Sequence, residues 1–523
     1  MSLLGVDMGT SSCKAVAFSE SGAVVASSAA AYVRRGGSDV GDELDAAVFW
    51  SSFVEVVRRT AEASKKDKIE ALAISAHGET IIPIDDRGEP CGPALLNRDN
   101  RSGPQIPAWE QRFGRDAIYA ITGLPVHSMY SLPKLLWLKE NRAEIFSRAR
   151  KFVTVADFLL MRMGVPQFVD YTMASRIMGF DIARLNWSEE LLGFVGLSSA
   201  NFSGVLPSGT AVGNLDAEHA RALLLEEGVT VVLGGHDQPC GAFGSGGSQA
   251  GCAVDSAGSY ECVTVVVNEP KNSPASLRYS LNSYPHVVSG KYVLLAFFPS
   301  GLVIDWLLEN FYMSDRASET ELQDAYSAVQ DEVEKRCPDP TGICVTPHLI
   351  GSDNPHWDLR ASLSVSGLRA HHGKYHLYKA VFEGIACELG ENLRVLEEVA
   401  GPISRCMIFG GGSRWDYGVQ IRADVTGRRL ERVESSEMAC HGAAMLAGVG
   451  AGVYRDFDEA VAGSRQATRG FAPSAQMAGR YEGQARRYAA LYEGLGKYRA
   501  LDVSDHAQVK GVGTGTANHG RRR

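Results

Sequence analysis

The sequence lacks a positive charge excess and a paired-cysteine pattern. Its 523 residues carry a net charge of −9, and no basic stripe appears before the last few residues, so we expect no nucleic-acid partner. The ten cysteines include no C-x-x-C pair, which is typical of reduced thiols rather than of a disulfide framework. Reduced thiols favour a cytoplasmic protein.

Long apolar runs are lacking as well. No charge-free apolar stretch reaches the roughly 20 residues that a membrane-spanning helix needs. The nearest, residues 438–454, is rich in Gly and Ala, which predicts a helix that packs closely against its neighbours. The sequence opens in an apolar, strand-like run that Asp7 interrupts, so we expect neither a signal peptide nor a membrane partner.

The motifs of several enzyme classes are absent. Without H-E-x-x-H or G-x-S-x-G, a metalloprotease or a serine hydrolase is disfavoured, and without G-x-G-x-x-G so is a dinucleotide oxidoreductase. The P-loop pattern G-x-x-x-x-G-K-[ST] is missing too. His372 and His376 have the i, i+4 spacing of metal ligands, but no third ligand is nearby, so we expect structural or solvated histidines.

The length and the apolar pattern predict two α/β domains. A chain of this size exceeds one ordinary core, which gives two domains of roughly 200–250 residues each. Strand–turn–strand patterns open the chain, and a strand is predicted over 69–75. Helical periodicity marks several further segments: 47–65, 130–150, 216–227, 299–312, 376–400 and 415–426.

One pattern occurs twice, about 250 residues apart. "VDMGTSSC" (6–13) and "VDSAGSYEC" (254–262) each place an Asp, a Gly and a hydroxyl residue in a turn between two apolar strands. The repetition indicates two domains of similar design that face one another. A pair of ordinary hairpins is the alternative.

The first of these turns is rich in hydrogen-bond donors. Closely spaced backbone N–H groups around Gly9, together with the hydroxyls of Thr10 to Ser12, predict an anion site, with Lys14 supplying positive charge. Asp7 would repel a phosphate unless a cation lay between them, so a Mg²⁺ ion is implied. The chain then runs into a second strand, unlike a P-loop, which runs into a helix.

Two other segments carry candidate chemistry. "FGGGSRWDYGVQIRADVTG" (409–427) follows an apolar strand and opens a helix, which suits a nucleotide site, although tight strand–helix packing also favours glycine. "GGHDQPCGAFG" (234–244) places Asp237 directly after a buried strand, where a carboxylate is costly unless it is used or paired. It can be a general base, a salt-bridged structural residue or a helix cap.

Two signatures complete a family resemblance. "MYSLPKLLWLKEN" (129–141) and "LSVSGLRAHHGKYHLYKAVFE" (363–383) match in register, apart from Leu363, which replaces a small residue. The matching positions are Lys134, Trp137, Glu140 and Asn141, and then Gly367, His376, Ala380 and Glu383. Over about residues 2–500 the chain resembles the FGGY family of carbohydrate kinases, within the actin/hexokinase/Hsp70 ATPase superfamily.

The resemblance implies an α/β fold with two actin-like (ribonuclease H-like) domains, each a mixed sheet flanked by helices, with an active-site cleft between them. The N-terminal domain, 1–246, would bind sugar and carry the first phosphate turn and the catalytic Asp. The C-terminal domain, 247–502, would bind nucleotide. Residues 503–523 are predicted to form a disordered tail.

The resemblance also implies residue roles. Asp237 matches the catalytic base, and Asp7 the acidic residue near the metal and phosphates. Ser259 stands where the family normally has Thr, so a hydroxyl is kept. The residues expected to bind the nucleotide are Gly9, Thr10, Ser11, Ser12, Lys14, Gly258, Ser259, Gly301, Asp305, Gly411 and Gly412.

The substrate side is less defined. Glu79 resembles a Glu of glycerol kinases, but Gly78 and Met129 stand where those enzymes have Arg and Tyr, which would open room for a different substrate. Each polar candidate, taken alone, also has a structural or surface interpretation. The candidates for binding substrate hydroxyls are His77, Glu79, Asp99, Arg101 and Gln238.

The sequence therefore predicts an ATP-dependent kinase with Mg²⁺ that acts on a small sugar or polyol, with a ketopentose such as xylulose favoured. A polyol kinase of the glycerol or erythritol type and a hexulose or deoxy-sugar kinase are alternatives. A rival from another class is a non-metabolic ATPase of the actin or Hsp70 type. A homodimer is left open.

Overall fold

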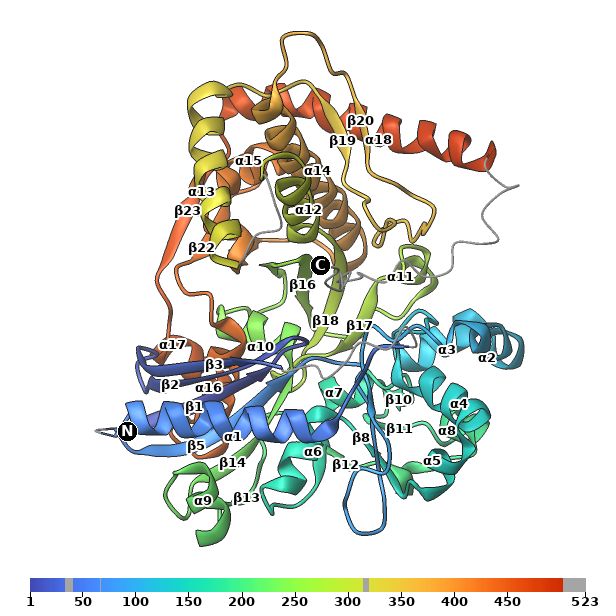
Figure 1. The fold of residues 1–523 in the computed structure, drawn as a ribbon, viewed down its shortest axis with the longest axis vertical. Coiled ribbons are helices and arrows are strands. Elements are labelled where there is room, and N and C mark those ends of the chain that lie inside the picture. The colour runs from blue at the N-terminus through green and yellow to red at the C-terminus, as the bar shows by residue number, and fades with distance from the viewer. Residues whose placement is uncertain (33–40, 66, 314–318, 502–523) are drawn as a thin grey trace, which may run out of the picture.

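The computed structural model describes residues 1–32, 41–65, 67–313 and 319–501. They form two mixed sheets flanked by helices (Figure 1), as the sequence predicts. We call the part built around the first sheet the first half, and the part from β15 onward the second half. The predicted tail, 503–523, lies outside the described residues.

The first sheet has the strand order β13-β14-β5-β1-β2-β3. Its strands are β1 (Ser2–Met8), β2 (Ser12–Ser19), β3 (Val24–Ala31), β5 (Ile69–Ala76), β13 (Ala211–Asn214) and β14 (Thr230–His236). The helices of this half are α1 (Ala46–Ala63), α2 (Ile106–Phe113), α3 (Arg115–Thr122), α4 (Ser131–Asn141), α5 (Ala143–Arg148), α6 (Val155–Arg162), α7 (Tyr171–Ser175), α8 (Glu189–Val195), α9 (Ala217–Leu223) and α10 (Asp237–Gly244). Short strands complete it: β4 (Glu43–Leu44), β6 (Ile82–Ile84), β7 (Ala94–Leu95), β8 (Lys151–Val153), β9 (Phe168–Asp170), β10 (Phe180–Asp181), β11 (Asn186–Trp187) and β12 (Gly204–Leu206).

The second sheet has the order β17-β18-β16-β15-β21-β22-β23. Its strands are β15 (Cys252–Ala257), β16 (Tyr260–Val267), β17 (Asn282–Pro285), β18 (Tyr292–Pro299), β21 (Arg405–Phe409), β22 (Leu430–Val433) and β23 (Thr468–Phe471), and β19 (Cys344–Thr346) pairs with β20 (Ser364–Ser366). The helices are α11 (Pro274–Arg278), α12 (Gly301–Phe311), α13 (Glu319–Arg336), α14 (Lys374–Ala400), α15 (Asp416–Thr426), α16 (Met438–Gly450), α17 (Phe457–Gly463) and α18 (Ala475–Leu501).

The two sheets repeat one design. In the first, β1 is antiparallel to β2 and parallel to β5, and β5 is parallel to β14. In the second, β15 is antiparallel to β16 and parallel to β21, and β21 is parallel to β22. The repeated turn therefore joins equivalent strands, which confirms the inference of two similarly built halves over the alternative of two unrelated hairpins.

Local chemistry explains the first layer of helices. The Asp45 carboxylate accepts the Ala47 N–H at 2.9 Å and so caps α1, a role that short acidic side chains perform well. The helix buries Phe49, Phe53 and Val56 at helical spacing, and these side chains belong to the core of the first half. The predicted helix over 130–150 is instead two helices, α4 and α5, separated at Arg142.

Helix α16 belongs to the later part of the sequence but packs on the first sheet, next to β1 (Figure 1). The approach is close because Gly5 has no side chain: a Cβ there would lie 1.8 Å from the carbonyl oxygen of Cys440. The Gly/Ala-rich segment thus packs as predicted. The predicted boundary at 246/247 falls between α10 and β15 and stays a prediction.

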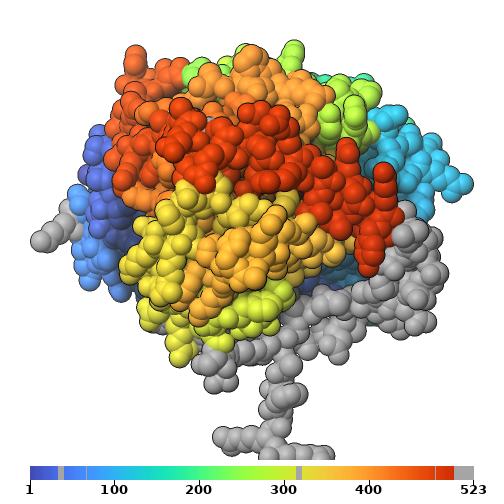
Figure 2. Space-filling model, turned by 90° about the horizontal axis from the view of Figure 1, so that it is seen from above, coloured from blue at the N-terminus to red at the C-terminus, as the bar shows by residue number. Residues whose placement is uncertain are grey.

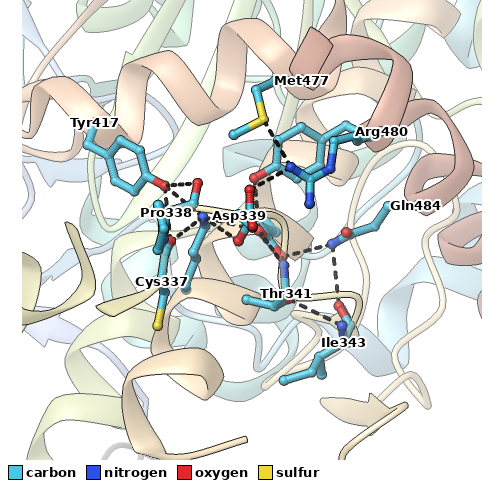
Figure 3. A network of polar contacts seen from close by, with 12 residues as sticks. Cys337, Pro338, Asp339, Thr341, Ile343, Tyr417, Met477, Arg480 and Gln484 are labelled. Atoms are coloured by element: carbon cyan, nitrogen blue, oxygen red, sulfur yellow. Dashed lines mark hydrogen bonds and ion pairs between the residues drawn. The ribbon is translucent and has the colours of Figure 1, made fainter. Parts of the chain in front are cut away.

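Helix α18 covers one side of the second half. It packs on β19 and α15 and runs across the surface beside α13 (Figure 2). Residues of the second signature hold the loop under α18, and α18 itself, in place. Lys379 on α14 donates hydrogen bonds to two carbonyls of loop 337–341, at 2.7 and 2.9 Å. Glu383 accepts hydrogen bonds from the same loop and from α18. Figure 3 shows this loop between Tyr417 of α15 and Arg480 of α18.

Two remaining features concern membranes and metals. Within the described ranges, no helix combines the length and apolar character needed to cross a bilayer. His372 and His376 each accept a backbone N–H through Nδ1, from Arg369 and Gly373. These contacts are structural, and the expectation that the pair binds no metal stays a prediction.

We expect Gly5→Ala to lower the free energy of unfolding by about 3 kcal/mol, because the added methyl group forces α16 away from β1. Chemical denaturation measures this change. Gly479→Ala on α18 is the matched control, because a Cβ there would meet no atom within 4 Å. This variant should be no less stable than the wild type, since Ala stabilises a helix by about 1 kcal/mol over Gly. Equal stability of Gly5→Ala and the wild type would contradict the packing described.

Candidate active site

Three parallel strands of the first sheet bring the predicted acidic residues to one edge. Strands β1, β5 and β14 run parallel, so their carboxyl ends lie at the same edge of the sheet. Asp7 is the penultimate residue of β1, His77 follows β5, and Asp237 follows β14 as the first residue of α10. The helix start places the positive end of the α10 dipole at this carboxylate.

The Asp237 carboxyl is oriented by its neighbour. His236 Nε2 lies 3.2 Å from Asp237 Oδ1, and His236 Nδ1 lies 3.0 Å from the Tyr284 hydroxyl. Burial and the nearby Arg176 hold the pKa of His236 well below its ordinary value, so the ring is neutral. The hydrogen bond between Tyr284 and His236 Nδ1 fixes the ring, so that its Nε2 edge lies against the Asp237 carboxyl. Tyr284 comes from β17, so the second half helps to position this carboxylate.

The site is rich in negative charge. Burial, followed by the neighbouring carboxylates of Asp7 and Glu79, raises the pKa of Asp237 to about 8. Burial also raises the pKa of Asp7 to about 6, against the opposing effects of the Ser75 hydroxyl, which donates to Asp7 Oδ1 at 2.8 Å, and of Lys14. Asp7 and Asp237 therefore lack a full counter-charge from the protein, which suits a divalent cation with oxygen ligands.

The first turn has the predicted strand–turn–strand form. The Gly9 N–H donates to the Ser12 carbonyl at 3.0 Å, while the side chains of Ser11 and Ser12 are exposed and that of Thr10 is half-buried. Lys14 lies opposite Asp7 on β2, but its Nζ also bonds Glu437 at 2.9 Å, at the start of α16. The lysine charge is thus shared between the turn and α16.

The predicted nucleotide residues of the second half come together. Gly301 at the start of α12 packs on the second turn, where a Cβ would lie 2.6 Å from the Gly258 carbonyl oxygen. The Ser259 carbonyl accepts the backbone N–H of Leu302 at 3.0 Å. A Cβ on Gly412 would lie 3.2 Å from Ala257, so the glycine-rich turn after β21 adjoins the same place.

Two other nucleotide candidates differ in their surroundings. Gly411 is exposed, and a Cβ there would meet nothing within 4 Å, which leaves room for a ligand at the backbone. Asp305 lies one helical turn beyond Gly301 and accepts the Tyr326 hydroxyl at 2.7 Å, and burial raises its pKa. Asp305 is therefore held by α13.

On the substrate side, His77 is fully engaged inside the protein. Its Nδ1 lies 2.7 Å from the Met8 carbonyl and its Nε2 lies 2.8 Å from the Thr80 hydroxyl. The ring is 3% exposed and links β1 to the segment after β5. These contacts give His77 a structural role in this arrangement, whereas Gln238, beside Asp237, is half-buried.

Asp99 and Arg101 pair with one another. Arg101 Nε lies 3.0 Å from Asp99 Oδ1, and its Nη2 also pairs with Glu43. The guanidinium lies 4.1 Å from the centre of the Trp137 ring, a residue of the first signature. Lys134 of that signature donates to the carbonyls of Glu79 and Leu96, at 3.1 and 2.6 Å. The signature helix α4 therefore supports both candidate substrate segments.

Glu79 has a partner that the sequence did not reveal. Arg176, just after α7, bonds Glu79 Oε1 through Nε at 2.6 Å. Its side chain fills the space beside Gly78, so that glycine does not open room for a larger substrate as expected. The available signal was a lone arginine in the apolar run "TMASRIMGF", and its partner lies 97 residues away in the sequence.

Comparison with known proteins agrees with this geometry. Models of the N-terminal and C-terminal domains of the FGGY family of carbohydrate kinases match residues 2–244 and 253–451. The gluconokinase of Bacillus subtilis is 25% identical over 460 residues, covering 87% of this chain and 89% of that protein. The xylulose kinase of Bacillus subtilis is 25% identical over 498 residues, covering 94% of this chain and 96% of that protein.

A solved structure shows the same fold. The crystal structure of a xyloylose kinase from Brucella ovis matches with a TM-score of 0.85 at 23% identity, covering 95% of this chain and 100% of that one. The two family models together span most of the sequence, and both halves carry their expected turns. The chain therefore belongs to the FGGY family of carbohydrate kinases, ATP-dependent enzymes that act on small-molecule sugars or polyols.

Proposed function

We propose that the protein transfers the γ-phosphoryl group of ATP to a hydroxyl of a ketopentose such as xylulose, with Asp237 as the general base. The observation that carries this proposal is the Asp237 carboxyl, a quarter exposed at the start of α10 and held by a neutral histidine. The likeness to the Bacillus subtilis xylulose kinase over nearly the full length supports the choice of sugar.

In the proposed reaction, Asp237 accepts the proton of the sugar hydroxyl as that oxygen bonds to the γ-phosphorus and ADP leaves. A positioned base contributes roughly 10²–10⁴-fold to such a reaction, and a raised pKa suits the task because the base must hold a proton near working pH. His236 and Tyr284 keep the carboxyl oriented. Alignment of the two substrates supplies much of the remaining rate.

The nucleotide would be held by both halves. Thr10, Ser11 and Ser12 offer donors in the first turn, and Gly258, Ser259 and Gly411 offer backbone and hydroxyl groups at the second edge. Asp7 would hold Mg²⁺, because its carboxyl lies beside Asp237 with a pKa raised by burial. Bound there, the ion would neutralise charge that develops on the phosphate oxygens.

A screen of sugars tests this proposal. We expect slow ADP release from ATP alone and at least a tenfold rise with a ketopentose, measured by a coupled assay across ketoses, aldoses and polyols. A larger rise with glycerol or erythritol would favour a polyol kinase instead. ATP hydrolysis that no compound in the panel stimulates would support the non-metabolic ATPase.

We expect Asp237→Asn to lower kcat by about 10²–10⁴-fold, because the amide cannot accept the proton. The affinity for ATP should stay within about twofold, since the residue acts on the sugar hydroxyl; calorimetric titration measures it. Ser21→Ala is the control, since Ser21 is an exposed residue whose hydroxyl contacts Ser19 at the far end of β2. Full turnover in Asp237→Asn would remove the residue from this role.

The pH profile follows from the same carboxyl. A base works only when deprotonated, so kcat/KM should rise with pH through the Asp237 pKa of about 8 and level off above it. A cation beside Asp7 offsets one of the negative charges that raise the pKa of Asp237. In the complex with both substrates and this cation, kcat should therefore rise at a lower pH than kcat/KM does. A flat kcat/KM from pH 6 to pH 9 would contradict the assignment.

A further inference from the structure

Arg176 occupies the place that a side chain at residue 78 would take. A Cβ added to Gly78 would lie 2.8 Å from Cγ and 3.1 Å from Cβ of Arg176. The glycine and the arginine are therefore sterically coupled, although they come from different segments. The guanidinium reaches the candidate substrate segment from α7 rather than from the strand edge itself.

Two polar side chains and two aromatic rings surround the Arg176 guanidinium. Nε and Nη2 pair with Glu79 Oε1, and Nη1 donates to Asn282 Oδ1 at 3.1 Å. The rings of Tyr130 and Tyr284 lie 5.2 and 5.0 Å from its central carbon. Arg176 is 3% exposed and Glu79 is 5% exposed, so both charges are buried as a pair.

Two polar atoms of this cluster remain unused. Among the described residues, the hydrogen bonds to the Glu79 carboxylate go to Oε1, which leaves Oε2 as an acceptor. Asn282 is fully buried, its Oδ1 accepts from Tyr130 and Arg176, and its Nδ2 has no partner among the described residues. A hydroxyl group both donates and accepts, so a polyhydroxy compound can donate to the free Oε2 of Glu79.

The charge balance disfavours an anionic ligand here. The positive charge of Arg176 is already matched by Glu79, and the next acidic groups along the edge are Asp7 and Asp237. The other nearby cation, Lys134, is engaged by the Glu79 and Leu96 carbonyls, and burial lowers its pKa to about 8. A carboxylate substrate would add a charge among carboxyls with the nearest guanidinium neutralised, which is costly in a buried site. The relatives include kinases for both kinds of substrate, since one is named for gluconate, an anion, and another for xylulose, a neutral ketose.

We propose that Arg176 is the residue that determines substrate specificity, and that its pairing with Glu79 selects uncharged polyhydroxy substrates, ketoses or polyols, and rejects aldonates. The inference rests on the proposed function and narrows its substrate class. It also explains Gly78: the substrate segment needs a glycine because the guanidinium comes from elsewhere.

Steady-state kinetics with the full-length protein test this inference. The substrates are the best neutral compound of the screen and D-gluconate. The wild type should prefer the neutral compound by at least 100-fold in kcat/KM. Arg176→Met should raise the KM for that compound by at least 30-fold, because the Glu79 carboxylate loses the partner that positions it. The KM for ATP should stay within twofold.

Two further variants separate recognition from folding. Arg176→Lys keeps the charge without the planar fork, so it should retain the neutral preference with a sugar KM raised about tenfold. Gly78→Ala keeps the arginine in the sequence but pushes its side chain aside, and should raise the sugar KM by a similar factor. Arg405→Met is the matched control. Arg405 pairs with Glu431 at 2.7 Å. It is the first residue of β21, at the opposite end of that strand from the glycine-rich turn.

The outcomes are distinguishable. A gluconate kcat/KM equal to or above that of every neutral compound would overturn this inference and leave the kinase intact. An unchanged sugar KM in both Arg176→Lys and Gly78→Ala would overturn the role of Arg176. ATP binding without stimulation by any compound would overturn the proposed function and this inference together.

Discussion

The close packing of α16 against the first sheet is the constraint on which the acidic edge, with Asp7 and Asp237, depends. Its backbone meets β1 at Gly5 and α10 at Gly442, where a Cβ would lie 2.0 Å from the Cys240 carbonyl. Strand β1 carries Asp7 and helix α10 begins at Asp237, so one helix sets the position of both acidic groups. Since α16 lies between β22 and β23 of the second sheet in sequence, this edge forms only when the two halves fold together.

That edge carries several carboxyl groups, and they differ in whether a positive group pairs with them. Glu79 has a buried guanidinium as its partner, whereas Asp237 has a neutral histidine that orients it without neutralising it. Burial and the neighbouring carboxylates raise the pKa of Asp237, which fits the proposed role as a base. The same imbalance makes the neighbourhood of Asp7 attractive to a divalent cation and unfavourable for an anionic sugar.

Local patterns made the sheets, the two turns and Asp237 predictable from sequence. The hairpins, α1 and α14 are encoded by periodicity and turn residues within short windows. Long-range partners were not predictable: Arg176 reaches Glu79 across 97 residues, and His77 is held inside by a strand far from it in sequence. The break at Arg142 was not predictable either, because arginine is no helix breaker by propensity and its partner Glu43, at 3.0 Å, is remote in the sequence.

The central claim is that the two halves join ATP and a neutral sugar in one phosphoryl transfer. The most direct measurement is ³¹P NMR of the protein with ATP, Mg²⁺ and the sugar that most stimulates ADP release. The account predicts a phosphomonoester resonance that grows in step with ADP and little inorganic phosphate. ADP formed together with an equal amount of inorganic phosphate, and no phosphomonoester, would contradict it.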